Sequence, residues 1–225
     1  MPRKSTSVRR VSLPKSLLKE ARMIVKNKWN LLETIPDGMN YCLQEKIIEN
    51  LFLHKAPGNT DIRDVWTKAS LLNIMYSTVV YAIPSVAREI VAIPNFDKRL
   101  VAGEHSLVPL IAKAGHSKWT YRSFATKYCA CHQPNLFPIY DSIVRDFLIN
   151  VISAGHLAGY ADTKKSSLSK IDRDYLYYKK VYDDFMTQYH LTSLTYRQVD
   201  WYIWVAHKCK KTAKLHSLNL FKIIK

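Results

Sequence analysis

Two residues on either side of a proline-bounded turn are the best candidates for chemistry in this chain. Lys127 lies in a segment with helical spacing, and Asp141 directly precedes another such segment. A lysine whose pKa is lowered by partial burial can act as a nucleophilic amine. A carboxylate at the start of a helix can activate water or stabilise a sugar cation of oxocarbenium character. Together the two groups suit the cleavage of a glycosidic bond.

The segment that carries Lys127 is predicted to be a helix over residues 119–132. Its apolar positions share one face, which we expect to belong to the core: Tyr121, Phe124, Ala125, Tyr128 and Cys131. Thr120, Ser123 and Lys127 follow the flank of that face, so Lys127 is expected at the edge of the core. A lysine there can equally cover apolar surface with its stem and keep its ammonium in water. Helix geometry leaves both interpretations open.

Asp141 follows Pro138-Ile139-Tyr140 and is predicted to be the N-cap of the next helix, a common role of aspartate. The inward positions of that helix are expected to be Ile143, Val144, Phe147, Leu148 and Val151. A capping carboxylate can also point out of the helix start into a cleft. The structural role and the chemical role are therefore compatible.

The rest of the chain is predicted to be almost entirely helical, because it has 6 Gly and little strand-like alternation. A flexible basic arm is expected over residues 1–12 and a long loop over residues 154–170. We expect helices over residues 14–32, 40–54, 61–79, 84–94, 106–114, 171–189 and 195–208. In the third of these, one apolar stripe is expected: Ile62, Val65, Trp66, Ala69, Leu72, Tyr76 and Val79. The fold class is all-α, with residues 13–225 as a single compact helical unit that can divide into two lobes around a cleft near residues 105–150.

The charge of the chain points to a polyanionic partner. Its 34 Lys and Arg against 18 Asp and Glu give a formal net charge of +16. Basic residues gather in the first 30 positions and again over residues 208–225. Such ends suit contacts to phosphates, which set affinity without reading sequence, although they can also be solvated tails. Nucleic acid, most of all double-stranded DNA, is therefore the expected partner, and a membrane is not.

Several other classes of protein are disfavoured. The basic N-terminus is not followed by the apolar stretch of a secretory signal, and Leu71 to Ile83 is too short to span a bilayer. The four cysteines form no C-x-x-C pair, so we expect free thiols in a reducing compartment, the cytoplasm. They are Cys42, Cys129, Cys131 and Cys209.

No cofactor or metal is expected from the sequence. Cys129, Cys131 and His132 are too closely spaced for a typical zinc site, even with His207 and Cys209 as a second pair. The Gly-x-x-x-x-Gly-Lys loop that binds nucleotide phosphates is missing from the sequence, as is the Gly-x-Ser-x-Gly elbow of hydrolases.

The residues around Lys127 and Asp141 resemble a pattern in bacterial proteins with an 8-oxoguanine DNA glycosylase-like fold, which belong to the helix-hairpin-helix DNA glycosylase superfamily. The pattern consists of Thr126-Lys127-Tyr128, Pro134 and the run from Phe137 to Ser142. The run Tyr196-Arg197-Gln198-Val199-Asp200-Trp201-Tyr202-Ile203-Trp204 is similar to the aspartate–tryptophan ending of such proteins. The main resemblance covers roughly residues 105–150.

The resemblance implies an all-helical protein that flips a base out of the DNA duplex and cleaves its glycosidic bond. By the same resemblance, Asp141 matches the family's aspartate and assists cleavage. Lys127, one to two turns beyond the family's lysine position, is a candidate nucleophile or electrostatic partner. Trp119, Ser123 and Tyr140 are then expected to line the pocket that receives the base.

In this superfamily, a hairpin with two glycines grips the phosphate backbone through main-chain N–H groups. The corresponding stretch Gly115-His116-Ser117-Lys118 has one glycine, and residues 119–123, where the family usually places its lysine, contain none. The monofunctional alkylbase glycosylases of the superfamily also lack that lysine and keep the aspartate. Nucleic-acid contacts are expected from the hairpin and the basic ends: His116, Ser117, Lys118, Arg122, Arg9, Arg10, Lys210 and Lys211.

The function that the sequence favours is a DNA glycosylase-like protein that excises a damaged or modified base. The alternative is a non-catalytic nucleic-acid-binding protein on the same scaffold, serving as an accessory in genome defence or repair. A weaker alternative is a helical interaction protein whose positive charge meets an acidic partner.

Overall fold

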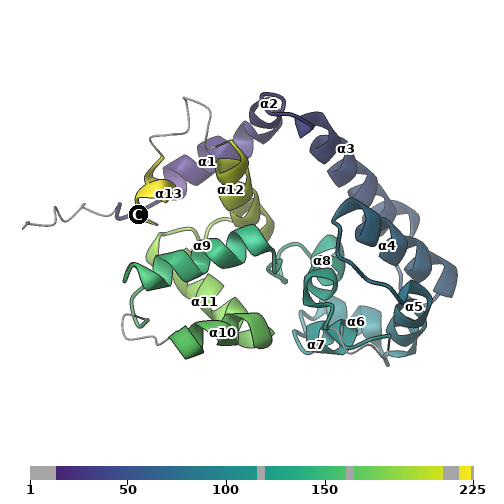
Figure 1. Cartoon of the computed structure of the whole chain (residues 1–225). Coiled ribbons are helices and arrows are strands. Elements are labelled where there is room, and N and C mark those ends of the chain that lie inside the picture. Colours follow the sequence, from purple (N-terminus) through teal and green to yellow (C-terminus); the bar gives the residue numbers. More distant parts are fainter. Residues whose placement is uncertain (1–13, 116–119, 161–164, 210–217, 224–225) are drawn as a thin grey trace, which may run out of the picture.

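The chain folds into helices joined by short connections (Figure 1). The computed structural model describes residues 14–115, 120–160, 165–209 and 218–223, with the side chains of residues 165–167 left out. Within these ranges there is no strand, so the predicted all-α class is confirmed.

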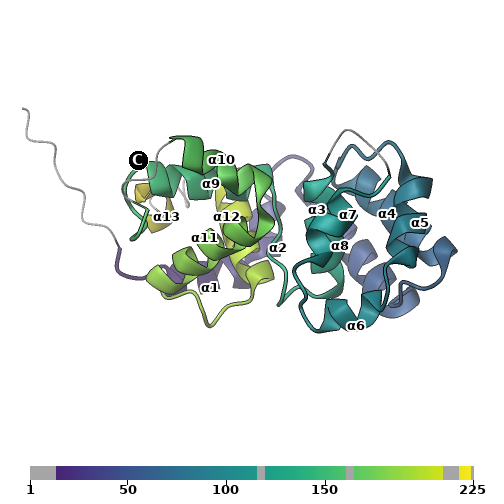
Figure 2. The ribbon, with the colours of Figure 1, turned by 90° about the horizontal axis from the view of Figure 1, so that it is seen from below.

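The helices form two groups that lie side by side in both views (Figures 1 and 2). The first, which we call the middle lobe, contains α3 (Gly38–Glu49), the π-helical turn η1 (Asn50–Lys55), α4 (Ile62–Met75), α5 (Ile83–Ala92), α6 (Phe96–Val101), α7 (Leu107–Ala112) and α8 (Arg122–His132). The second, the terminal lobe, contains α1 (Leu18–Lys26), α2 (Lys28–Leu32), α9 (Ser142–Ser153), α10 (Lys165–Arg173), α11 (Tyr175–Gln188), α12 (Tyr196–Lys208) and α13 (Asn219–Lys222).

The chain crosses between the lobes twice. It leaves the terminal lobe at the corner between α2 and α3 and returns through residues 133–141, between α8 and α9 (Figure 1). The terminal lobe is therefore built from both ends of the described chain, with α1 packed against α12. Residues distant in sequence consequently meet where the lobes face each other.

Several helix starts agree with the capping residues expected from the sequence. The carboxylates of Asp61 and Asp141 accept hydrogen bonds from the N–H groups of Arg63 and Ile143, both at 2.8 Å. Thr195 begins α12 with a capping box: its hydroxyl accepts from the N–H of Gln198, whose side chain accepts from the N–H of Thr195.

The tyrosine-rich helix α11 is a core element, as expected. Five aromatic side chains on one of its faces are buried: Tyr175, Tyr178, Tyr182, Phe185 and Tyr189. Two of their hydroxyls donate to main-chain oxygens of the segment between the lobes, Tyr178 to Ile139 at 2.6 Å and Tyr175 to Pro138 at 3.2 Å. The core of the terminal lobe thus holds the segment that leads to Asp141.

Several sequence predictions differ from the structure. The predicted loop over residues 154–170 is wrong at its end, because α10 begins at Lys165. The single helix expected over residues 14–32 is divided at Asn27, and the short helices α6 and α13 were not expected. In α4 the stripe is only partly buried: Ile62, Trp66 and Val79 are exposed, whereas Lys68 is fully buried.

The described parts of the chain contain no helix with the length and apolar character needed to cross a bilayer.

Candidate active site

A cavity of about 320 Å³ opens where the two lobes face each other. The middle lobe contributes side chains from α3, the end of α4 and α8, and the terminal lobe contributes α12. The start of α9 and the residues before it complete the wall with Ile139, Asp141, Ser142 and Ile143. The volume is at the lower end of the range for small-molecule pockets, about 300–1,000 Å³.

Lys127 and Asp141 both reach this cavity. The Lys127 Nζ atom lies 3.8 Å from Asp141 Oδ2 and donates a hydrogen bond to Ser123 Oγ at 2.7 Å. Lys127 is only 5% exposed, so it is more deeply buried than the edge position expected from the sequence. Burial lowers its pKa, while the charges of Asp141 and Asp200 act in the opposite direction.

Asp141 uses its two carboxylate oxygens differently. Its Oδ1 atom accepts the N–H of Ile143 and caps α9, while its Oδ2 atom faces Lys127. The position of the carboxylate follows from the preceding segment, which is hydrogen-bonded to both lobes. The N–H of Tyr140 donates to Thr126 Oγ1 at 3.0 Å, next to Lys127 in α8. This bond, together with the tyrosine hydroxyls of α11, brings the start of α9 against α8.

A second charged group on the cavity wall was not assigned a role from the sequence. Arg197 of α12 donates to Asp200 Oδ2 at 3.1 Å and to Glu45 Oε1 at 3.2 Å, and its Nη2 atom is 3.4 Å from the hydroxyl of Tyr76. Glu45 also accepts the indole N–H of Trp201 at 2.8 Å. Because Glu45 belongs to α3 and Arg197 to α12, this ion pair joins the two lobes.

Aromatic rings form much of the remaining wall. Tyr41, Tyr76, Trp201 and Trp204 line the cavity. The rings of Tyr41 and Trp204 meet edge to face at 4.8 Å, and those of Trp201 and Trp204 do so at 5.7 Å. Flat aromatic walls suit a flat, π-bonded ligand such as a nucleobase.

The residues of α12 that line the cavity could have been identified from their spacing in the sequence. Arg197, Asp200, Trp201 and Trp204 follow the i, i+3, i+4, i+7 spacing of one helical face. Charges and indole rings combined in such a stripe are unusual for a core face, which is normally apolar. Tyr41, Gln44 and Glu45 of α3 form a shorter stripe on the cavity, with the i, i+3, i+4 spacing.

Tyr140 and Ser123 do not have the positions expected for wall residues. The Tyr140 hydroxyl donates to Asp172 at 2.7 Å, and its ring packs edge to face on Tyr178, away from the lining residues. Ser123 contacts the site through its hydrogen bond with Lys127. Within the described residues, the aromatic part of the wall comes from α3, from α12 and from Tyr76 at the end of α4.

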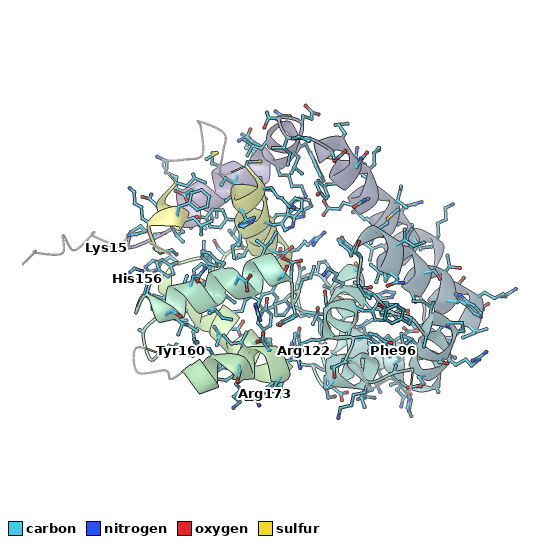
Figure 3. All side chains as sticks on the ribbon, in the orientation of Figure 1. Lys15, Phe96, Arg122, His156, Tyr160 and Arg173 are labelled. Atoms are coloured by element: carbon cyan, nitrogen blue, oxygen red, sulfur yellow. The ribbon has the colours of Figure 1, made fainter. Side chains whose placement is uncertain are left out.

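Arg122, labelled in Figure 3, is the first residue of α8, and its guanidinium lies 5.5 Å from the centre of the Tyr140 ring. It is half-buried, and burial lowers its pKa. The other residues expected to contact nucleic acid or line the pocket lie outside the described residues: Arg9, Arg10, His116, Ser117, Lys118, Trp119, Lys210 and Lys211.

In the described ranges, no group of three or more His, Cys, Asp or Glu side chains could hold a metal ion. Cys129 is buried, and His132 beside it has its Nε2 atom 3.3 Å from the ammonium of Lys68. The chemical groups of the cavity include carboxylates, the amines of Lys127 and Lys208, a guanidinium and aromatic rings.

Comparison with known proteins places the chain within a family. The family model HI_0787_N, described as an N-terminal domain, matches residues 21–136. An uncharacterized protein of Haemophilus influenzae strain Rd is 34% identical over 153 residues, which are 67% of this chain and 69% of that protein. No solved structure matches the chain. The family match includes Lys127 and ends before Asp141.

Proposed function

The chain belongs to the HI_0787_N family, and we propose that this member is a DNA glycosylase-like enzyme that excises a damaged or modified base. The observation that carries the proposal is the meeting of Lys127 and Asp141, 14 positions apart in sequence and on different lobes, at one aromatic-walled cavity. A helix-hairpin-helix glycosylase scaffold, which the sequence resembles, is part of the same proposal.

The cavity suits a nucleotide that has been flipped out of a duplex. Flipping costs a few kcal/mol and costs least for a damaged or mismatched base. Tyr41, Trp201 and Trp204 offer rings on which the base can stack. A net charge of +16 provides the attraction to phosphates that brings the duplex to the protein.

Asp141 would then act on the sugar. Its Oδ2 atom takes a proton from a water molecule as the water oxygen bonds to C1′ and the bond from C1′ to the base breaks. A negative carboxylate also stabilises the positive charge that develops on the sugar ring in the transition state. The Oδ1 atom is already engaged as the cap of α9, which fixes the orientation of the carboxylate.

Lys127 offers a second route. Its lowered pKa increases the fraction of neutral amine near neutral pH, and a neutral amine can attack C1′ directly. Such an attack forms a covalent bond between the lysine and the sugar as the base departs. If water attacks instead, Lys127 acts as an electrostatic partner that positions Asp141.

A non-catalytic nucleic-acid-binding role is the second candidate, and one observation favours it. The polar groups of the pair already have protein partners: Asp141 is engaged by Ile143 and Lys127, and Lys127 by Ser123. A pair satisfied in this way can serve as a structural link between α8 and α9. This candidate predicts DNA binding with a steep salt dependence and no base release.

The two candidates are distinguished by incubating the full-length protein with duplexes that carry a panel of damaged or modified bases, followed by alkaline cleavage. We expect strand breaks at one class of base with the wild type and none with Asp141→Asn. The amide oxygen of asparagine can still cap α9, so folding should be unchanged. Asp174→Asn is the matched control, because Asp174 caps α11 and is not among the residues lining the cavity.

Trapping with borohydride tests the role of Lys127 in the same assay. A covalent protein–DNA adduct that disappears in Lys127→Gln identifies the lysine as the nucleophile. Base release without an adduct assigns attack to water. Retained turnover in Asp141→Asn contradicts the role of Asp141, and the absence of duplex binding at low salt contradicts both candidates.

A further inference from the structure

We propose that Asp200 is the general acid of this site and protonates the base as it leaves the sugar. The inference rests on the proposed function and assigns a role to a carboxyl group that the Lys127–Asp141 pair does not use. It follows from where Asp200 lies in the cavity, from the partners of the two carboxyl groups, and from the chemistry that glycosidic cleavage requires.

Asp200 lies on the cavity wall but is only 8% exposed. It belongs to the face of α12 that also carries Trp201 and Trp204, the rings on which a flipped base would stack. Asp141 lies at the start of α9, on a different element of the same cavity. The two carboxyl groups can therefore reach a nucleotide from different directions, with Asp200 on the side of the base-stacking rings.

The two carboxyl groups have different surroundings. Asp141 is 23% exposed at its side chain, accepts a main-chain N–H and faces an ammonium group. Asp200 is more deeply buried, and Arg197, its hydrogen-bonded cation, is shared with Glu45. Burial raises the pKa of Asp200 to about 6, with Arg197 opposing the shift and the charge of Asp141 adding to it.

Charged and titratable groups act on Asp200 from its own helix and from several neighbouring elements. They are Arg197 on α12, Lys127 on α8, Asp141 before α9, Glu45 on α3, and the hydroxyls of Tyr178 and Tyr182 on α11. The cations and anions of this set are nearly balanced, so a proton on Asp200 is not displaced by an excess of positive charge. A buried carboxyl group and a more exposed, hydrogen-bonded one in the same site are a known arrangement for acid and base roles.

The proposed step balances as follows. The bond from C1′ to the base nitrogen breaks, and its electron pair goes to the base, which takes the proton of Asp200 at a nitrogen or oxygen. Water bonds to C1′ and gives its proton to Asp141. The products are the free base and the abasic sugar, and proton exchange with solvent returns the two carboxyl groups to their starting states.

The test is the pH dependence of base release in single-turnover reactions of the full-length protein, over roughly pH 5 to 8, on the duplex that the wild type cleaves best. Because the acid must carry its proton, we expect the wild-type rate to fall about tenfold per pH unit above pH about 6. Asp200→Asn should lower the rate near pH 5.5 by about 10²-fold or more and should remove this decline. Asp200→Glu should restore part of the rate together with the decline.

The affinity for the uncleaved duplex is measured in parallel and should be unchanged in both variants. A decline with pH that persists in Asp200→Asn, or an equal loss of rate at every pH, overturns the assignment of Asp200 while the proposed function stands. If Asp200→Asn does not fold, an Asp200→Glu variant with the rate restored but no decline overturns it equally. A wild type that releases no base at any pH contradicts the proposed function itself, and the role of Asp200 with it.

Discussion

Buried lysines illustrate how the same residue type serves two purposes in this protein. Lys127 reaches the cavity, where it has a carboxylate and a serine as partners. Lys68 is fully buried in the middle lobe and donates to the main-chain oxygens of Ala56 and Gly58 and to the side chain of Asn59. The ammonium of Lys68 thus closes the loop between η1 and α4, and its role is structural.

We predict that Lys68→Met lowers the free energy of unfolding by about 2–4 kcal/mol, because three oxygens lose a charged donor in a buried place. Urea denaturation followed by circular dichroism measures the change. Lys55→Met, at an exposed position nearby, is the control and should have little effect. An equal, small change in both variants would show that the Lys68 hydrogen bonds contribute little to stability.

At the scale of elements, local sequence signals determine where several helices begin, and close packing determines how they turn. Asp61, Asp141 and Thr195 begin α4, α9 and α12 through side-chain caps, and the sequence predicts the cap at Asp141. The corner between α2 and α3 depends instead on the absence of a side chain. A Cβ atom at Gly38 would lie 1.6 Å from the carbonyl oxygen of Leu32.

We therefore expect Gly38→Ala to destabilise the protein by at least about 1–3 kcal/mol, since the atom in the way belongs to the main chain and cannot rotate aside. Thermal denaturation measures the effect. Gly58→Ala is the matched control: an added Cβ would have an ordinary contact of 3.7 Å with Asp97. Equal melting temperatures for Gly38→Ala and the wild type would mean that the corner relaxes without cost.

At the scale of the whole molecule, the cavity exists because the two lobes are held against each other. The ion pair between Glu45 and Arg197 connects α3 with α12. Asp200 accepts a further hydrogen bond from Arg197, and Trp201 donates one to Glu45. The hydrogen bond from the N–H of Tyr140 to Thr126 fixes the segment of residues 133–141, where the chain returns to the terminal lobe, against α8. Substrate binding and the relative position of the lobes are therefore expected to be coupled.

We predict that Arg197→Met destabilises the protein by about 3–5 kcal/mol, because it removes the hydrogen-bonded cation of buried Asp200 and one of the two cations of half-buried Glu45, which keeps Lys28 at 3.4 Å. The double variant Arg197→Met with Asp200→Asn should recover part of this loss, since it also removes the buried carboxylate that the single variant leaves without its hydrogen-bonded cation. Urea denaturation of the single and double variants measures the coupling. Additive losses in the double variant would show that the two side chains do not form an energetic unit.

The sequence by itself determines the helical class, most helix starts, and the two residues around which chemistry can be expected. These depend on short-range spacing: the periodicity of apolar side chains, the caps, and the prolines. The helix α10 was missed because its residues are polar and rich in serine, so no apolar stripe distinguishes them from a loop. The apolar stripe predicted over residues 61–79 includes side chains that are exposed, because periodicity cannot tell which of two adjacent rows of side chains on a helix faces the core.

Only the tertiary structure decides that Lys127 and Asp141 meet and which residues surround them. Their distance of 3.8 Å depends on the tyrosines of α11 and on Thr126, which fix the connecting segment. The rest of the cavity comes from α3, α4 and α12, whose residues lie from about 50 to more than 80 positions away from Lys127 along the chain. Contacts at such separations arise from the packing of the two lobes, and no local pattern of residues encodes them.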